Sequence, residues 1–239
     1  MSHPERRLTA AEARRFKGLV SKRASRVPVA YLTGVKEFYG HALRVTPSVL
    51  IPRPETELLV SLAIEFLRGH PSANMVLEVG TGSGAIAVAL ARAMPSVRVV
   101  ATDVDARALR VAAGNVRAQR LASRVQLKKA DLLQGAHRAD LIIANLPYLS
   151  AAQRRRWQPE LSHEPAAALN GGQDGLDLIR RALVQAPGVL KPGGALVMEL
   201  DPSQARRVAQ LARAQWPAGE VTIHTDLSGR ARALRVLLP

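Results

Sequence analysis

The chain of 239 residues contains no cysteine, which excludes disulfide bonds and metal sites built from thiolates. Its six histidines show no pairing at the spacing of metal ligands, so no metal is expected. No apolar stretch approaches the roughly 18 residues that a membrane helix requires, and the N-terminus lacks the apolar core of a signal peptide. These absences predict a cytoplasmic protein with no metal and no membrane partner.

The composition indicates one folded domain with an extension, because 47% of the residues are hydrophobic, which is close to a globular average. The charge is unbalanced, with 34 Lys and Arg against 19 Asp and Glu and a formal net charge of +15. Such a charge favours encounters with polyanions such as RNA or the ribosome. The basic residues are spread along the whole chain, so an arginine-rich composition explains them equally well.

A glycine-rich turn joins a predicted buried strand to a predicted helix. Met75–Val79 has the apolar run of a parallel strand, and Ala85–Ala93 has the alanine-rich composition of a helix. Glycines between them let a ligand approach the main chain, although a tight turn alone also needs glycine. The spacing G-x-G-x-G differs from the dinucleotide fingerprint G-x-G-x-x-G, so a nicotinamide or flavin cofactor is disfavoured. The turn comprises Gly80, Thr81, Gly82, Ser83 and Gly84.

A carboxylate follows the next predicted strand. Residues 97–102 are predicted to form a strand that ends in Asp103, about 20 residues beyond the glycine turn, where an acidic side chain commonly binds ribose hydroxyls. Asp103 has a second interpretation as the N-cap of a helix that begins at Ala106. Together with the glycine turn, the first interpretation predicts a cofactor that bears a nucleoside.

The tetrapeptide Asn145, Leu146, Pro147 and Tyr148 follows another apolar run, Leu141–Ala144. A short buried parallel strand places such residues at its carboxyl end, where these sheets bind ligands. An Asn carboxamide oxygen and a backbone carbonyl can accept the two hydrogens of a planar amino group while a Tyr ring covers its face. This clamp fits adenine, cytosine or a glutamine side chain. The alternative is a plain strand-to-loop turn, in which Asn, Pro and Tyr are ordinary residues.

These motifs together resemble the class I S-adenosylmethionine-dependent methyltransferases, whose first motif reads LEVGTGSG here and whose fourth reads NLPY. Residues 28–57, PVAYLTGVKEFYGHALRVTPSVLIPRPETE, are similar to the segment before the catalytic domain in the bacterial peptide chain release factor glutamine methyltransferases, the HemK or PrmC family. The run EPAAALNGGQDGLDLIRRAL at 164–183 and the late segment DLSGRARAL resemble the same family. The resemblance covers residues 26 to 239, and IPRPETE is its family-specific part.

The resemblance implies the cofactor S-adenosyl-L-methionine. It places the glycine turn beside the methionine moiety, Asp103 on the ribose, and Leu132, which follows Asp131, near the adenine. Asn145 also faces the cofactor in this pattern. Glu78 either fixes the turn, meets the amino group of the cofactor or caps the following helix, and the sequence leaves the three roles open.

The implied reaction transfers a methyl group to the side-chain amide nitrogen of the glutamine in the Gly-Gly-Gln motif of a release factor, which is the expected protein partner. Asn145 Oδ1 and the Leu146 carbonyl accept the two N–H bonds of that amide, and Tyr148 packs on its plane. Pro147 completes the catalytic tetrapeptide. No general base is required, because the attacking nitrogen becomes acidic as the new bond forms.

Two departures from the family keep other hypotheses open. Leu146 stands where the family has proline, and NLPY also occurs in ribosomal RNA adenine dimethyltransferases. Only about 25 residues precede the matching segment, too few for the helical domain with which the family docks the release factor. An RNA or DNA amino-group methyltransferase of the N6-adenine type is therefore the alternative. A catalytically silent scaffold is a third hypothesis, which Asn145 and Tyr148 disfavour.

The predicted fold is α/β, a Rossmann-like doubly wound sheet of seven strands with a short N-terminal helix and a β-hairpin extension. We expect a truncated helical segment at 1–25, a hairpin with a proline-rich linker at 26–56, and the methyltransferase domain at 57–239. Smaller features are predicted in the same way. They are a helix at Thr9–Val20 with Thr9 as its cap and Glu12 three residues on, a hairpin at Lys36–Val45, a helix at Glu57–Leu67, a turn at 191–194 before a strand at Ala195–Leu200, and a final antiparallel pair at Val221–Thr225 and Ala233–Leu237. The basic run Arg154–Trp157 is interpreted as a solvated face, with a basic lip beside the clamp as the alternative, and Gly-Gly-Gln at 171–173 as a coincidence in a loop.

Overall fold

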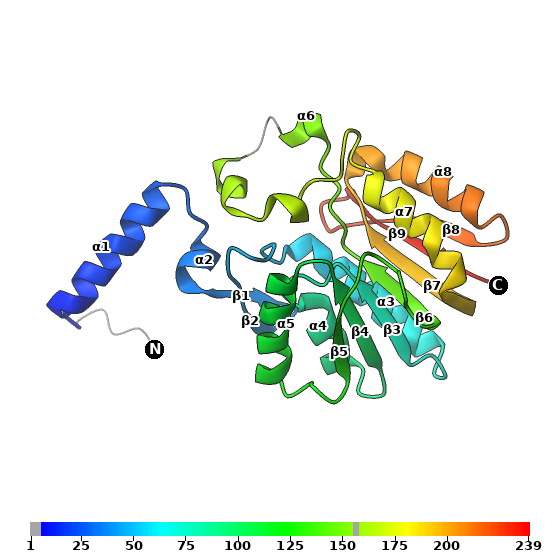
Figure 1. Cartoon of the computed structure of the whole chain (residues 1–239), viewed down its shortest axis with the longest axis horizontal. Helices are drawn as coiled ribbons and strands as arrows, with labels where there is room; N and C mark the ends of the chain where they lie inside the picture. Colours follow the sequence, from blue (N-terminus) through cyan, green and yellow to red (C-terminus); the bar gives the residue numbers. More distant parts are fainter. Residues whose placement is uncertain (1–5, 155–157) are drawn as a thin grey trace.

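A sheet of seven strands forms the centre of the computed structural model, which describes residues 6–154 and 158–239 (Figure 1). The strand order is β5-β4-β3-β6-β7-β9-β8, with the first five strands parallel and β9 antiparallel to both of its neighbours. This order confirms the predicted doubly wound fold. The strands are β3 Met75–Val79, β4 Arg98–Asp103, β5 Val125–Lys129, β6 Ala139–Ala144, β7 Leu190–Glu199, β8 Glu220–Thr225 and β9 Ala231–Leu237.

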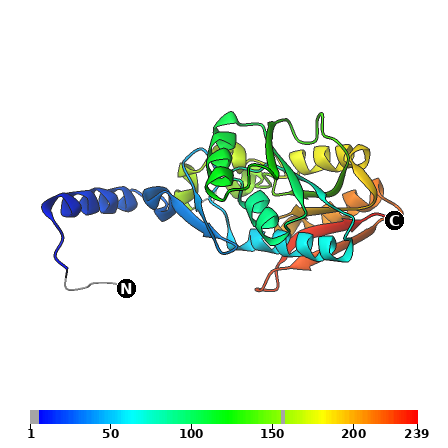
Figure 2. The same cartoon turned by 90° about the horizontal axis from the view of Figure 1, so that it is seen from below.

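Helices cover both faces of the sheet because its central strands are apolar on both sides. In β6, Leu141 and Ile143 belong to one buried cluster, whereas Ile142 and Ala144 belong to the other. The first cluster lies under α3, α4 and α5, and the second lies under α7 and α8 (Figures 1 and 2). These helices are α3 Glu57–Gly69, α4 Ala85–Ala93, α5 Ala106–Ala118, α7 Asp177–Gln185 and α8 Ala205–Gln215.

One strand differs from its prediction, because β7 begins at Leu190 and includes residues 191–194, which the sequence predicted as a turn. Leu190 pairs with Ala139 and Ala195 pairs with Leu141, so the segment between them bulges out of the parallel ladder. The bulge is held from the other side by the end of the chain. The Gly193 N–H donates to the Pro239 carbonyl at 2.9 Å, and the Leu238 N–H donates to the Gly194 carbonyl at 2.9 Å.

The N-terminal helix α1, Ala10–Ala24, begins as predicted and extends beyond the predicted end at Val20. Thr9 and Glu12 form a reciprocal capping box, in which each side chain accepts a hydrogen bond from the backbone N–H of the other. No residue of α1 is buried, and the helix projects away from the body in Figures 1 and 2. Its C-terminal end is fastened by Glu160, which accepts from Arg23 at 3.0 Å and Arg26 at 3.2 Å.

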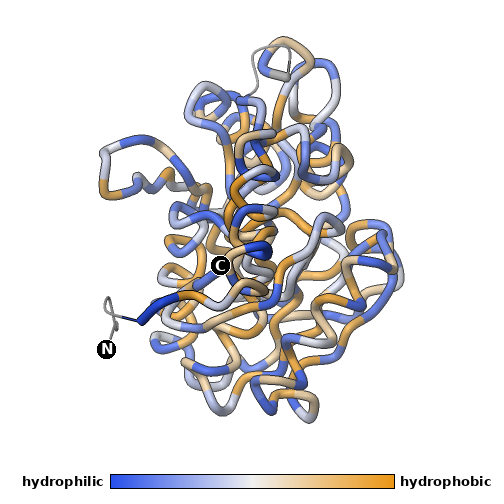
Figure 3. The backbone as a smooth tube through the Cα atoms, turned by 90° about the vertical axis from the view of Figure 1, so that its left-hand side faces the viewer, coloured by the Kyte–Doolittle hydropathy of each residue, from blue (hydrophilic) through white to orange (hydrophobic). Residues whose placement is uncertain are grey.

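The predicted hairpin is present as β1 Val35–Phe38 and β2 His41–Arg44, and Phe38 is buried against the first core cluster. Apolar segments run through the middle of the body in Figure 3, as burial in two clusters requires. Within 6–154 and 158–239, no helix is both long and apolar enough to span a membrane. The basic run at 154–157 falls largely on residues 155–157, outside the described residues. The short remaining helices are α2 Val29–Thr33, η1 Pro54–Thr56, α6 Ala151–Arg154, η2 Pro159–His163, η3 Ala166–Ala168, η4 Ala186–Gly188 and η5 Pro202–Gln204.

Candidate functional site

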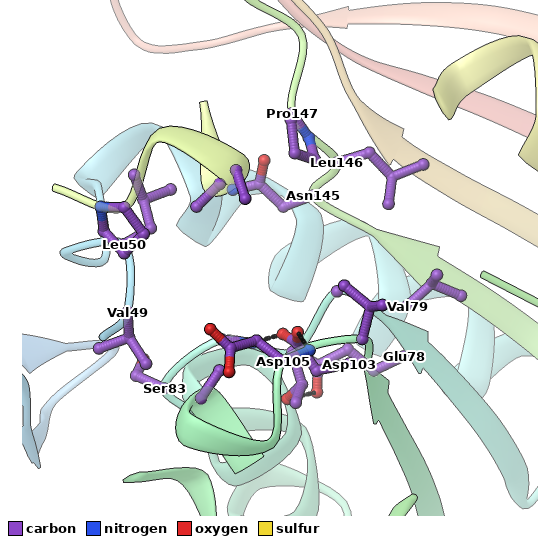
Figure 4. Close-up of a pocket in the computed structure, with 18 of the residues that line it drawn as sticks. Val49, Leu50, Glu78, Val79, Ser83, Asp103, Asp105, Asn145, Leu146 and Pro147 are labelled. Carbon is purple, nitrogen blue, oxygen red and sulfur yellow. Dashed lines mark hydrogen bonds between the residues drawn. The ribbon is translucent and has the colours of Figure 1, made fainter. Parts of the chain in front are cut away.

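A pocket lies at the carboxyl ends of β3, β4 and β6, where the strand order reverses between β3 and β6. Open α/β sheets bind ligands at such a switch point. In Figure 4, Asn145 and Pro147 lie on one side of this pocket, and Asp103 and Ser83 lie on the other. The lining residues with a role below are Thr56, Glu78, Gly80, Thr81, Gly82, Ser83, Asp103, Asp131, Leu132, Asn145, Leu146, Pro147, Pro165, Ala167 and Ala168.

The glycines of the turn are required for different reasons. The backbones of Gly80, Gly82 and Gly84 all have positive φ, at 74°, 56° and 80°, a conformation that residues with a side chain rarely adopt. A Cβ on Gly84 would lie 3.2 Å from the Cβ of Ala112, so this glycine lets α4 pack closely on α5. A Cβ on Gly82 would meet nothing within 4 Å, which leaves room for a ligand there. Gly84 is the one member of the turn that does not line the pocket.

Asp103 supports the glycine turn and does not cap a helix. Its Oδ2 accepts from the Gly82 N–H at 2.9 Å, and its Oδ1 accepts from the Asp105 N–H at 2.9 Å. The N-cap of α5 is Asp105, which accepts from the Arg107 N–H at 2.7 Å, so the cap interpretation of Asp103 is wrong. Each Asp103 oxygen keeps a further lone pair for a ligand in the pocket.

Glu78 is buried beneath the turn and is held by it. The Thr81 hydroxyl donates to Glu78 Oε2 at 2.8 Å. Burial raises the pKa of the Glu78 carboxyl to about 8, while the Thr81 hydroxyl and the backbone of Ala87 oppose the rise and the nearby charge of Asp103 adds to it. Of the three roles left open by the sequence, fixing the turn has a side-chain hydrogen bond in the structure, the one from Thr81.

Leu132 lines the same pocket from the loop after β5. Its φ is +52°, an uncommon backbone conformation for a residue with a branched side chain. The residue is buried, with only 7% of its surface exposed. Such a conformation persists where the surroundings hold it, which is common at ligand sites. Asp131 lines the pocket beside Leu132.

The tetrapeptide divides between pocket and core. Asn145, Leu146 and Pro147 line the pocket, and Leu146 is also buried in the second core cluster. Tyr148 does not line the pocket, because its hydroxyl is bound to Glu199 Oε1 at 3.0 Å. Burial and the charge of Glu199 raise the pKa of Tyr148 well above its ordinary value. Both ends of the tetrapeptide make specific side-chain hydrogen bonds, Asn145 with Thr56 and Tyr148 with Glu199.

A glycine loop presses on the back of the tetrapeptide. A Cβ on Gly171 would lie 2.8 Å from the Pro147 carbonyl oxygen, and a Cβ on Gly175 would lie 2.2 Å from the Tyr148 carbonyl oxygen. Any side chain at either position would displace the tetrapeptide. Gly171, the first glycine of Gly-Gly-Gln, therefore has a structural function here, whereas the sequence analysis took the tripeptide as a coincidence. The clustering of three glycines at 171, 172 and 175 is the signal that indicates such a close approach.

The wall formed by Pro165, Ala167 and Ala168 is tied to the IPRPETE segment by a buried carboxylate. Glu164 is 6% exposed, accepts from the Ile51 N–H at 2.9 Å and forms an ion pair with Arg53. This segment therefore shapes the pocket although it precedes the sheet in the chain. No group of three or more His, Cys, Asp or Glu side chains in the described part of the chain could hold a metal ion.

Comparison with known proteins agrees with this geometry. The model of the methyltransferase small domain matches residues 56–172, and the model of the PrmC N-terminal domain matches residues 1–34. The release factor glutamine methyltransferase of Bordetella pertussis is 44% identical over 220 residues, which cover 91% of this chain and 80% of the relative. That of Moorella thermoacetica is 41% identical over 230 residues, or 95% of this chain and 81% of the relative. The chain belongs to the release factor glutamine methyltransferase family.

A solved member of this family has the same fold. It is the release-factor-specific protein-(glutamine-N5) methyltransferase of Alicyclobacillus acidocaldarius, which is 33% identical with a TM-score of 0.52 and covers 82% of this chain and 99% of its own. Membership confirms the resemblance that residues 28–57 and the two motifs indicated. The family and the fold imply a methyl donor of the S-adenosylmethionine type. The relatives support a protein-glutamine substrate and do not support the nucleic-acid alternative.

Two residues of the site escaped the sequence analysis. Thr56 ends η1 inside IPRPETE and lines the pocket, and Glu199 ends β7 and is 2% exposed. A carboxylate inside the apolar run Ala195–Leu200 was the available signal for Glu199, because charged residues are rarely buried without a specific partner. For Thr56 the sequence offered only its place in the family-specific block.

Proposed function

We propose that this chain transfers a methyl group from S-adenosyl-L-methionine to the side-chain amide nitrogen of the glutamine in the Gly-Gly-Gln motif of peptide chain release factors. The observation that carries the proposal is the place of Asn145 and Leu146 at the pocket, directly beside the glycine turn. A Cβ on Gly80 would lie 3.5 Å from the Asn145 carbonyl oxygen and from Leu146, so donor site and acceptor site are contiguous. The names of the relatives supply the substrate class.

We place the cofactor along the turn. The main chain of residues 80–84, with the side chains of Thr81 and Ser83, would line the methionine moiety, and Asp103 would accept the ribose hydroxyls with its remaining lone pairs. Leu132 would pack on the adenine. Glu78 holds the turn in shape, and its carboxyl would lose its proton when the amino group of the cofactor binds beside it. The open space at Gly82 and the partly satisfied carboxylate of Asp103 both support this fit.

The site must supply position, because an amide nitrogen is a poor nucleophile whose lone pair is delocalised into its carbonyl. We propose that Asn145 Oδ1 and the Leu146 carbonyl accept the two amide hydrogens and hold the nitrogen about 3 to 3.5 Å from the methyl carbon. Pro147 limits the backbone freedom of the clamp. Tyr148 lies outside the pocket lining, so we assign it the anchoring of the tetrapeptide to Glu199 and not the expected contact with the amide plane. The nitrogen loses its proton to these acceptors or to water as the new bond forms.

Competition between two substrates tests this function. With cofactor labelled in its methyl group, a purified release factor and deproteinised ribosomal RNA present together, label should enter the protein. A release factor whose Gly-Gly-Gln glutamine is replaced by alanine provides the matched control and should remain unlabelled. Label in the RNA alone would overturn the proposal and restore the nucleic-acid alternative.

Leu146→Pro should change turnover by no more than about tenfold, or roughly 1.4 kcal/mol in barrier height. The substitution restores the residue common in the family and keeps the backbone carbonyl, so the acceptor survives while φ becomes fixed. Single-turnover methylation of the release factor provides the measurement. A loss of several hundredfold would show that the Leu146 side chain, and not its carbonyl, matters for the reaction.

Cofactor affinity should rise with pH over the range below the Glu78 pKa of about 8. The positive amino group of the cofactor favours the ionised carboxylate, so binding below this pKa must first remove a proton from Glu78. We expect an increase of about 20-fold between roughly pH 6 and 7.5 by calorimetry, because the ionised fraction of a group with this pKa rises by that factor. Glu78→Gln should flatten the profile. A nucleoside analogue without the amino acid moiety should bind wild type with no such dependence, and an equal dependence would contradict the contact.

We propose the division into a helical segment at 1–25, a hairpin and linker at 26–56 and a methyltransferase domain at 57–239. The match of residues 1–34 to the PrmC N-terminal domain supports a docking role of the first segment.

Helix α1 is basic and exposes Phe16 and Val20. With the net charge of +15, docking near the ribosome or RNA would be electrostatic. Raising salt from about 0.05 to 0.3 M should therefore increase KM for the release factor severalfold and leave cofactor affinity nearly constant. A KM independent of salt would contradict this docking mode.

A further inference from the structure

Three segments that are distant in the sequence are joined behind the clamp by a chain of hydrogen bonds. Asn145 Nδ2 donates to Thr56 Oγ1 at 3.1 Å, and Thr56 Oγ1 donates to Glu199 Oε2 at 2.6 Å. Tyr148 donates its hydroxyl to the other oxygen of the same carboxylate at 3.0 Å. The chain runs from the pocket into the core, since Thr56 is 4% exposed and Glu199 is 2% exposed.

The chemistry of the three groups fixes the direction of the chain. An ionised carboxylate can only accept hydrogen bonds, so the single hydroxyl hydrogen of Thr56 is committed to Glu199. Thr56 Oγ1 can then only accept from Asn145, and the sole donor of that side chain is its amide nitrogen. If the Asn145 carboxamide were turned over, Oδ1 would face an oxygen with no hydrogen left to share. Such an unpaired contact disfavours the turned-over orientation in a site shielded from water.

We propose that Thr56 and Glu199 are positioning residues that set the polarity of the clamp, by directing the nitrogen of Asn145 into the core and its oxygen into the pocket. The proposal rests on the proposed function. The amide or amino group of the substrate points its hydrogens at the clamp. The Asn145 oxygen can accept a hydrogen bond from them, whereas the Asn145 NH2 group would repel them. The family-specific threonine of IPRPETE thereby acquires a role in the reaction without touching the substrate.

The direction depends on the ionised form of Glu199. Burial raises the pKa of this carboxyl, the neighbouring charge of Glu55 adds to the rise, and the hydroxyls of Thr56 and Tyr148 together with the charge of Arg232 oppose it. Protonation as the pH falls through this raised pKa gives Glu199 a hydrogen of its own to donate. The Thr56 hydroxyl is then free to turn toward Asn145, and the preference for one carboxamide orientation is lost.

Thr56→Val removes the hydroxyl at nearly constant shape, and Thr56→Ser restores it. We expect Thr56→Val to lower kcat for release factor methylation by about tenfold, while its cofactor affinity by calorimetry stays within about twofold of wild type. Thr56→Ser should recover turnover to within about threefold of wild type. Intact cofactor binding shows that the valine variant is folded. Valine and serine variants with equal turnover would overturn the proposal.

A spectroscopic measurement tests the same point without activity. The chain has four asparagines, so selective 15N labelling gives few side-chain amide signals, and Asn145→Asp identifies those of Asn145. In wild type, the resonance of one Asn145 amide proton should lie downfield, because that proton is hydrogen-bonded to Thr56. Its chemical shift should change on acidification as Glu199 takes up a proton. In Thr56→Val the resonance should show neither the downfield position nor the change. Asn115 provides an internal reference, because its side chain is bound to backbone groups of Arg44 and Ser83.

The two readouts separate the two proposals. A wild-type enzyme that fails to methylate the release factor would remove the proposed function, and the amide signals of Asn145 would still report the orientation. Asn145 signals in wild type that neither show a hydrogen-bonded proton nor respond to acidification would overturn the positioning role, whatever the activity. This last measurement needs no variant of Thr56, so it holds even if the valine substitution prevents folding.

Discussion

Asn145→Ala should lower turnover by about 10² to 10³, the usual loss for one preorganised polar contact in an active site. The substitution deletes the oxygen that Thr56 and Glu199 direct into the pocket, so the substrate amide keeps only the Leu146 carbonyl as an acceptor. Cofactor affinity should fall much less than turnover, because the glycine turn and Asp103 are untouched. Single-turnover methylation, with cofactor binding measured in parallel by calorimetry, provides the test.

Asn74→Ala is the matched control for this variant. Asn74 is exposed and directly precedes β3, so it lies at the amino end of that strand, opposite the pocket at the carboxyl ends. Its truncation should therefore leave both turnover and cofactor affinity at wild-type values. An Asn145→Ala enzyme with near-normal turnover would mean that the tetrapeptide is only a turn. The proposed mechanism would then have to be abandoned.

Asp103→Ala should weaken cofactor binding by about 1 to 3 kcal/mol, or roughly fivefold to 150-fold. The substitution removes the acceptor for the ribose, and it also leaves the Gly82 N–H without the partner that fixes the glycine turn. Turnover at saturating cofactor should be much less affected than affinity. Titration calorimetry with S-adenosylmethionine measures the loss directly.

Asp140→Ala separates affinity from stability. Asp140 accepts hydrogen bonds from the Asn74 and Met75 N–H groups and pairs with Lys191 at 2.8 Å. It lies at the amino end of β6, away from the pocket at the carboxyl end. Its loss should lower the melting temperature and leave cofactor affinity unchanged. Equal affinity for wild type and Asp103→Ala, or tighter binding of a nicotinamide dinucleotide than of the sulfonium cofactor, would remove the cofactor assignment.

The sequence predicted those parts of the site that follow strands directly. Glycine turn, Asp103 and tetrapeptide each come after a predicted strand, and parallel strands bring such positions to one edge. The partners of Asn145 could not be predicted in this way. Thr56 lies 89 residues from Asn145 and 143 residues from Glu199, and no periodic pattern relates positions in such different segments.

The fold shows the same division between local and distant causes. The capping box of α1 was predicted because Thr9 and Glu12 lie three residues apart in one turn. The bulge in β7 was not predicted because it depends on two distant hydrogen bonds, one that the Gly193 N–H donates to Pro239 and one that the Gly194 carbonyl accepts from Leu238. The cap of α5 could not be decided from the sequence for a different reason, and Asp103 was only one of two interpretations. Asp103 and Asp105 are both suitable caps by residue type. Because β4 continues through Asp103, it is Asp105 that lies directly before α5 and caps it.

Tandem mass spectrometry of the Gly-Gly-Gln peptide is the most direct test of the account. A purified release factor is incubated with this enzyme and S-adenosylmethionine, with Asn145→Ala in parallel, and the tryptic peptide is fragmented. The account predicts one added methyl group on the glutamine side-chain amide, formed quickly by wild type and slowly by the variant. An unmodified glutamine after complete incubation with wild type, or a methyl group on another residue of the peptide, would contradict it.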